Sequence, residues 1–243
     1  MKSITIIGTG NVATHLCIAL AGTVEELINI PSRSLEDLPT DSDLYILSVS
    51  DDAIETVASQ LPPLKGILTH TSGSKPMDIL APYAERYGVF YPLQTFTKGS
   101  DLNYSEIPVF IEGSSPEVAA TLSGVAALFT SRIYPADSAR RKVLHVASVF
   151  ACNYVNHLWS IADRILRDNG MGLDVLYPLM NATLEKAMRI PPHEGQTGPA
   201  IRDDKQVLLS HLQMLGASAD ADIYRLLGNS ILKEYNHETL PEL

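Results

Sequence analysis

The feature that most constrains the fold lies at the start of the chain, where a short apolar run leads into a glycine-rich turn. Residues 4–7 are mostly apolar and β-branched, and Gly8-Thr9-Gly10-Asn11-Val12-Ala13 follows them. An apolar-periodic stretch over 12–21 comes next, so the pattern predicts a strand, a tight turn and a helix. Gly8 permits the turn, Gly10 leaves space beside the backbone, and the small Ala13 lets the helix pack on its strand.

The rest of the first half alternates strands with helices. We expect further strands at 26–30, 44–49, 66–70, 88–91, 108–112 and 132–134, and helices at 53–61, 76–87 and 116–129. The run 44–49 is almost wholly apolar, as in a strand buried on both faces of a parallel sheet. This alternation is typical of a layered α/β domain.

The period of the pattern changes after Pro135. Helical spacing extends over 138–169 without Pro or Gly and returns at 173–188, 203–214 and 220–235, with no convincing strand. We therefore expect an α/β domain over 1–136 and an all-helical domain over 137–243. A helix as long as the first one commonly packs against a second subunit, although a buried central helix gives the same pattern.

Composition excludes several classes of function. The 18 basic residues face 28 acidic ones, which gives a net charge of −10 and disfavours nucleic acid. No window has the roughly 20 apolar residues that a membrane span needs. The two cysteines lie far apart and the seven histidines are scattered without metal-ligand spacing, so we expect neither disulfides nor a metal. A cytoplasmic protein is the default expectation.

The glycine-rich turn suits a dinucleotide, because a pyrophosphate would meet free N–H groups at the positive end of the helix. Proteins that bind NAD usually place an acid about 20 residues further on, but this chain has Ser32-Arg33-Ser34 there. A guanidinium between two hydroxyls suits a 2′-phosphate, which favours NADP. Two alternatives stay open: Arg33 is a solvated side chain neutralised by Glu36 and Asp37, or the turn binds S-adenosylmethionine.

Further motifs follow the turn in order. They are Ser48-Val49-Ser50-Asp51-Asp52-Ala53-Ile54, His70-Thr71-Ser72-Gly73, Tyr91-Pro92-Leu93-Gln94-Thr95-Phe96, His145 with Ala147, Ala151-Cys152-Asn153-Tyr154, Tyr177-Pro178-Leu179, and Thr197-Gly198-Pro199 leading to Arg202-Asp203. Over nearly the whole chain, this set resembles a bacterial family of Rossmann-like NADP oxidoreductases with a C-terminal helical domain of unknown function. That family is related to pyrroline-5-carboxylate reductase, deazaflavin-dependent NADP oxidoreductases and β-hydroxyacid dehydrogenases.

The resemblance implies a Rossmann-like NADP-binding domain, an all-α dimerisation domain of the 6-phosphogluconate dehydrogenase C-terminal-like type, and a cleft between them. It implies no particular substrate. The chain departs from the family in two places. Tyr91-Pro92 stands where the family usually has His-Pro, and the segment 35–43 replaces a helix and a further strand.

Candidate site residues follow from the expected carboxyl ends of the strands and from the long helix. For the cofactor they are Gly8, Thr9, Gly10, Asn11, Val12, Ser32, Arg33, Ser34, Val49, Ser50, Asp51 and Ser72. For catalysis they are His70, His145 and Asn153, and for the substrate Tyr91, Gln94, Thr197 and Arg202. His70 is an equally good candidate for holding its own loop by hydrogen bonds, and His145 with Asn153 for a satisfied buried pair.

These observations predict a homodimeric oxidoreductase that transfers a hydride between NADP(H) and a small carbonyl or imine compound. A non-catalytic NADP-binding sensor or assembly module would show the same turn and the same arginine. An S-adenosylmethionine-dependent transferase is a further alternative, which Arg33 disfavours because that ligand has no 2′-phosphate.

Overall fold

The computed structural model describes residues 1–241. It contains two compact units, Met1–Tyr154 and Val155–Leu243. The division falls later than the expected boundary at 136/137. The reason is that Arg141, on the helix after Pro135, is buried and contacts Glu112 in the sheet and the carbonyl of Ser72. That helix, α4 (Ser138–Ser148), therefore belongs to the first unit.

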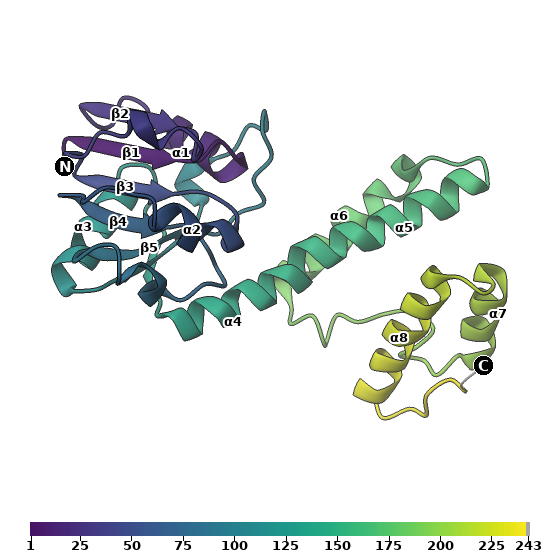
Figure 1. Cartoon of the computed structure of the whole chain (residues 1–243). Helices are drawn as coiled ribbons and strands as arrows, with labels where there is room; N and C mark the ends of the chain where they lie inside the picture. Colours follow the sequence, from purple (N-terminus) through teal and green to yellow (C-terminus); the bar gives the residue numbers. More distant parts are fainter. Residues whose placement is uncertain (242–243) are drawn as a thin grey trace. The chain divides into compact units, whose positions relative to one another are not determined.

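The first unit is built on a seven-stranded sheet with the order β2-β1-β3-β4-β5-β6-β7 (Figure 1). The strands are β1 (Ser3–Ile7), β2 (Glu26–Ile30), β3 (Leu44–Leu47), β4 (Ile67–His70), β5 (Tyr87–Pro92), β6 (Val109–Gly113) and β7 (Ile133–Pro135). All neighbouring pairs are parallel except β5 and β6, which run antiparallel. Since the strand order reverses around β1, the carboxyl ends of β1 and β3 form the switch point where ligands bind in such sheets.

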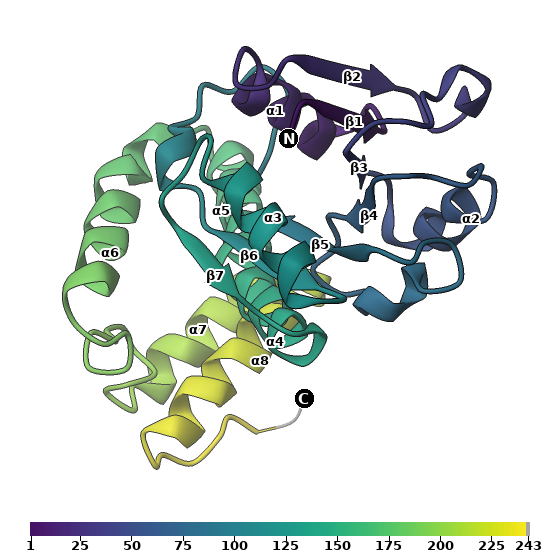
Figure 2. The same ribbon diagram turned by 90° about the vertical axis from the view of Figure 1, so that its left-hand side faces the viewer.

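Helices cover both faces of this sheet, as the nearly continuous apolar strands require. Helices α1 (Asn11–Leu20) and α3 (Pro116–Ala126) close one core, and α3 lies along β5 and β6 (Figure 2). The short helix α2 (Ile54–Ala58) contributes to the core of the other face. The expected α/β fold is confirmed.

Some helices differ from the expected ones. No helix spans 76–87: a 3₁₀ turn, Met77–Leu80, is followed by turns up to β5. Pro82 is the physical reason, because it supplies no N–H and its ring crowds the preceding turn of a helix. The helix expected at 53–61 is also shorter, with a 3₁₀ turn at its start and α2 ending at Ala58.

The uninterrupted helix expected over 138–169 is confirmed, with an unexpected segment inside it. Helix α4 continues through a π-helix, Val149–Tyr154, into α5 (Val155–Asp168). Asp137 caps the start of α4, where its carboxylate accepts the N–H of Arg140 at 2.8 Å. A π-helix has wider i→i+5 turns, so side chains on either side of it no longer share the faces that a uniform α-helix would give.

The second unit contains helices joined by loops and no strand among residues 155–241. After α5 it contains α6 (Tyr177–Arg189), α7 (Lys205–Leu215) and α8 (Ala219–Glu234). Helices α7 and α8 pack as a hairpin around a small core that includes Leu208, Leu212 and Leu232. Arg164 of α5 forms an ion pair with Asp220 of α8 at 2.7 Å. None of the helices among residues 1–241 is long and apolar enough to cross a membrane.

Candidate functional site

The glycine-rich turn has the geometry of an anion-binding helix start. Gly8 adopts φ +135°, and a Cβ there would fall on the Ser48 carbonyl, so only glycine fits this position. Gly10 precedes α1 in an extended conformation, and no side chain caps the helix. The first N–H groups of α1 are therefore left to a ligand. The Asn29 amide supports the turn by donating to the Gly8 carbonyl at 2.8 Å.

A cavity of about 430 Å³ opens at this turn, within the usual range of ligand pockets. Of the residues expected to bind the cofactor, it is lined by Gly8, Thr9, Gly10, Asn11, Val12, Ser32, Val49 and Ser50. Ser48, Ala53 and Thr71 line it as well and were not expected to. Arg33, Ser34, Asp51 and Ser72 do not line this cavity.

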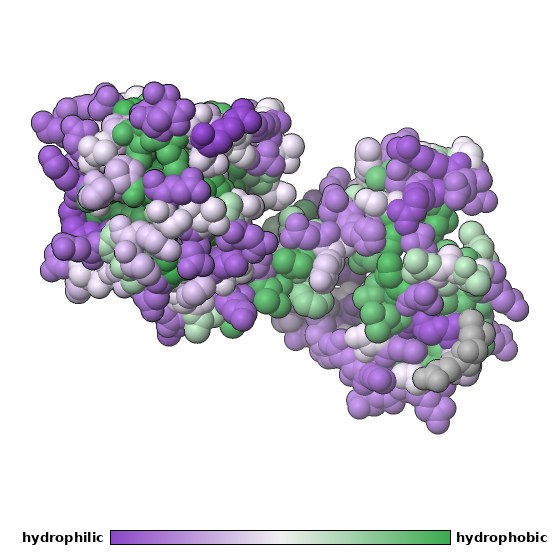
Figure 3. All heavy atoms as spheres, in the orientation of Figure 1, coloured by the Kyte–Doolittle hydropathy of each residue, from purple (hydrophilic) through white to green (hydrophobic). Residues whose placement is uncertain are grey.

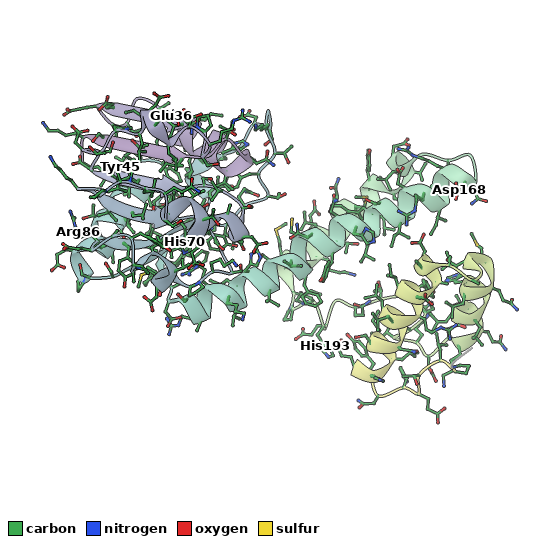
Figure 4. The ribbon with its side chains drawn as sticks, viewed as in Figure 1. Glu36, Tyr45, His70, Arg86, Asp168 and His193 are labelled. Carbon is green, nitrogen blue, oxygen red and sulfur yellow. The ribbon has the colours of Figure 1, made fainter. Side chains whose placement is uncertain are left out.

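Two hollows of about 500 and 540 Å³ lie at the amino ends of the strands, where both are lined by Lys65, Gly66 and Arg86. Figure 4 labels Arg86 at that end of the sheet and His70 at the other. The larger hollows have neither a glycine-rich turn nor a free helix start. We therefore place the candidate site at the carboxyl ends, where open parallel sheets bind ligands.

Arg33 is exposed beyond β2 and forms no ion pair within the described part of the chain. Glu36 and Asp37 lie in a 3₁₀ turn, Leu35–Asp37, and form none there either. The acids therefore leave the guanidinium free. A free guanidinium suits a phosphate group.

His70 ends β4 and is fully buried. Its Nδ1 accepts the N–H of Ser72 at 3.1 Å, and its Nε2–H donates to the Pro76 carbonyl at 3.3 Å. Burial lowers the pKa of His70 to about 4, against a smaller opposing effect of the Pro76 carbonyl. The ring is thus neutral, with both nitrogens occupied by the loop. Of the two expectations for this residue, the geometry favours the one in which it holds the loop.

The loop after β4 is fixed by its own hydroxyls. The Ser72 hydroxyl accepts the N–H groups of Ser74 and Lys75 at 3.1 and 3.0 Å. Ser74 in turn donates its hydroxyl to Asp51, which belongs to the loop after β3. The side chains of Asp51 and Ser72 therefore position two neighbouring loops.

Arg141 of α4 joins this loop to the helix, a role that the sequence analysis missed. Its guanidinium is buried, donates to the carbonyls of Ser72 (3.1 Å) and Lys75 (2.6 Å), and forms an ion pair with Glu112. The neighbouring Lys142 is exposed. An arginine in a polar helical turn gives no sequence signal for this role, because its partners lie 29 to 69 positions away.

Tyr91 and His145 meet beside the same loop. The Tyr91 hydroxyl lies 3.3 Å from His145 Nδ1, and both are close to Gly73. Two expected site residues, one on β5 and one on α4, are therefore brought together. Gln94, three positions after Tyr91, is exposed and accepts the N–H of Thr95 at 2.7 Å.

The remaining expected site residues stay predictions. Asn153 is exposed in the π-helix, so it forms no buried pair with His145. Thr197 and Arg202 belong to the helical unit, where Thr197 lines a small cavity of about 170 Å³ together with Lys186. Within residues 1–241, no three His, Cys, Asp or Glu side chains cluster as metal ligands.

Comparisons with known proteins agree with this architecture. The model of a domain of unknown function, DUF2520, matches residues 107–231. A solved structure from Bacteroides fragilis, provisionally described as an NADP oxidoreductase, is 36% identical, with 96% of this chain and 98% of that chain covered and a TM-score of 0.85. A search of curated proteins finds no significant match.

Two more distant structures share the fold alone. Pyrroline-5-carboxylate reductase from Streptococcus pyogenes is 17% identical with a TM-score of 0.61, covering 96% of this chain and 97% of that one. A reductive aminase from Aspergillus terreus, solved with NADPH and ethyl-5-oxohexanoate, is 13% identical with a TM-score of 0.62. The match covers 98% of this chain and 88% of that chain.

Proposed function

Because the chain belongs to the family defined by the DUF2520 domain, and because its first turn leaves a helix start open to an anion, we propose that it is an NADP-dependent oxidoreductase. The observation that carries this proposal is the cavity at the Gly8 turn combined with the unpaired Arg33 beyond β2. The first feature suits a pyrophosphate and the second a 2′-phosphate. The Bacteroides fragilis relative carries the same provisional description.

Each part of the pocket has its own task. The backbone N–H groups at the start of α1 hold the pyrophosphate, and Arg33 with Ser32 and Ser34 holds the 2′-phosphate. Val49 and Ser50 line the path toward β4, where the loop fixed by His70 lies. When bound, the nicotinamide supplies a hydride to a substrate carbon.

A small molecule with a polarised C=O or C=N bond is the substrate class we propose. Such a reaction requires the protein to orient the two reactants and to supply one proton. The Tyr91–His145 pair at the carboxyl edge of the sheet, beside the loop after β4, supports this proposal, because it offers a side chain that can supply such a proton. A non-catalytic NADP-binding protein would use the turn and Arg33 but would have no need for this pair.

We also propose that the helical unit pairs with a second copy of this chain. Large apolar side chains of α6, Leu179, Leu184 and Met188, expose 60 to 71% of their surface, and green side chains lie open on the helical unit in Figure 3. Apolar patches of this kind on soluble proteins usually mark an interface. Light scattering should give twice the 26.5 kDa of one chain, and Leu184→Glu with Met188→Glu should reduce the mass to one chain.

Calorimetric titration with NADPH, NADH and S-adenosylmethionine tests the cofactor. A charge-assisted hydrogen bond contributes about 1.5–3 kcal/mol, so NADPH should bind at least about tenfold more tightly than NADH. Arg33→Ala should abolish that preference. Arg86→Ala, which removes another exposed arginine at the opposite end of the sheet, should preserve it. Tighter binding of S-adenosylmethionine, or no binding of either nicotinamide, would contradict the proposal.

A further inference from the structure

Three elements converge on one point at the carboxyl edge of the sheet. They are the loop after β4, the end of β5 and the last turn of α4, represented by Gly73, Tyr91 and His145. The Tyr91 hydroxyl and His145 Nδ1 are 3.3 Å apart, and the two rings meet edge to face with centroids at 6.4 Å. A phenol and an imidazole at this separation can exchange a proton.

Gly73 makes this meeting possible. A Cβ at this position would lie 2.7 Å from Tyr91 Cζ and 2.8 Å from both the Tyr91 hydroxyl and His145 Nδ1. Any side chain would therefore push the two polar groups apart. Tyr91 and His145 therefore pack directly against the backbone of Gly73.

Other polar groups of this edge are already committed. His70 uses both ring nitrogens on the loop, and Lys75 pairs with Asp52 at 3.3 Å. Arg141 donates to Glu112, to the Ser138 hydroxyl and to two carbonyls. Asp51 accepts the Ser74 hydroxyl. Within the described residues, neither the Tyr91 hydroxyl nor His145 Nδ1 forms a hydrogen bond to this loop, so the proton between them is not tied to it.

The surroundings keep the phenol protonated. Burial raises the pKa of Tyr91, since only 8% of the residue is exposed, and Asp51 acts in the same direction. Ser148 and Arg141 of α4 oppose this effect. His145 is only partly buried, so it connects the enclosed phenol with solvent.

We propose that Tyr91 is the proton donor of the reduction and that His145 reloads it, an inference that rests on the proposed hydride transfer. The hydride forms a C–H bond at the carbon of the C=O or C=N group while the π electron pair moves to oxygen or nitrogen. That atom takes the proton of the Tyr91 hydroxyl, whose O–H bond breaks. The phenolate then takes the proton on Nδ1 of His145, and the ring recovers a proton from the solvent, so the reduction consumes one solvent proton.

The aromatic neighbours of Tyr91 provide a matched control. Tyr91 on β5 lies opposite Phe110 on β6, and Phe110 lies opposite Tyr134 on β7. The rings of Phe110 and Tyr134 stack with their centroids 5.4 Å apart. Tyr134 thus lies in the same cross-strand row but away from Gly73 and His145. Tyr91→Phe and Tyr134→Phe each remove one hydroxyl and keep the ring, so neither variant should disturb folding.

The test measures NADPH-dependent reduction of two probes, 1-pyrroline-5-carboxylate for C=N and ethyl levulinate for C=O, with NADPH affinity measured by calorimetry. Tyr91→Phe should lower kcat about 100-fold or more, the usual range for a lost general acid, and leave the Kd for NADPH within about twofold. Tyr134→Phe should retain the wild-type kcat. His145→Ala should lower kcat and recover with added imidazole, while Tyr91→Phe should not recover.

A second measurement needs no substrate. The ring NMR signals of His145, recorded at one fixed pH, should change in Tyr91→Phe and not in Tyr134→Phe, because only the first variant removes the hydroxyl beside Nδ1. Unchanged His145 signals, or a kcat of Tyr91→Phe within about twofold of wild type, overturn the donor assignment. Failure of the wild-type protein to bind NADPH contradicts the proposed oxidoreductase instead, so the two failures are distinguishable.

Discussion

In the sheet-containing unit, Ile4, Ile6 and Leu44 are fully buried, whereas Met188 and Leu226 of the helical unit each expose 71% of their surface. The two units also treat charge differently. The Arg141–Glu112 pair of the first unit is nearly buried, while Arg164 of the Arg164–Asp220 pair in the second is half exposed. The sheet of the first unit is enclosed by a buried apolar core and carries a buried ion pair, whereas helices α6 and α8 of the second unit leave large apolar side chains exposed. The same interaction should therefore contribute very different free energies in the two units.

The largest difference is expected when each ion pair is broken. Arg141→Met leaves Glu112 without its cation and two loop carbonyls without a donor, so the free energy of unfolding of the first unit should fall by about 3–5 kcal/mol. Arg164→Met removes a solvated pair, which contributes about 1 kcal/mol or less. Urea denaturation followed by the methyl NMR signals of Ile46 and of Leu212 reports the two units separately.

The double variant Arg141→Met with Glu112→Leu controls for the orphaned carboxylate. It should regain part of the lost stability, because replacing both partners removes the uncompensated charge. A loss below about 1 kcal/mol in Arg141→Met alone would show that the buried pair is no stronger than the exposed one, and the contrast between the units would fail.

The second prediction concerns pH. Because the pKa of His70 falls from 6.5 to about 4 on folding, the native state binds this proton less tightly than the unfolded chain does. The free energy of unfolding is therefore at its full value with respect to His70 above pH 6.5. It decreases by about 3 kcal/mol as the pH falls from 6.5 toward 4, at 1.36 kcal/mol per pKa unit. Urea denaturation of the first unit at a series of pH values measures it.

His70→Gln should remove this part of the pH dependence, since glutamine does not titrate. His157→Gln, an exposed substitution in α5, should leave the pH dependence of the first unit unchanged. If His70→Gln keeps the wild-type slope between pH 7 and 4, the buried neutral histidine is not what destabilises the unit in acid.

These contacts also show which parts of the molecule the sequence could predict. Strands such as 26–30 and the turn at Gly8 follow from local pattern, because periodicity and glycine requirements act over a few residues. The candidate pocket followed from the same local signals. The pairing of Tyr91 with His145 and the role of Arg141 could not be predicted, since their partners lie 29 to 69 positions away along the chain. The π-helix at Val149–Tyr154 carries no sequence signal that we can identify.

Asn11 shows most clearly what the sequence could not predict, because its side chain has a long-range partner. The sequence assigned Asn11 to the cofactor, and this residue does line the pocket. Its side-chain amide, however, donates to the Phe96 carbonyl at 2.8 Å. His15, one turn later, donates from Nε2 to the Thr97 carbonyl and accepts the Tyr104 hydroxyl at Nδ1, both at 2.8 Å. Helix α1 thus holds the segment between β5 and β6 through two side chains.

The smallest effect is therefore expected from Asn11→Ala. The variant loses one partly exposed hydrogen bond, which contributes about 1 kcal/mol, and keeps the backbone N–H groups at the start of α1. Amide hydrogen exchange in the segment after Phe96 should become about fivefold faster, and the Kd for NADPH should stay within about threefold. A tenfold loss of NADPH affinity with unchanged exchange would place the side chain on the cofactor instead. His15→Phe separates the two effects, because it loosens the same segment from a position outside the pocket.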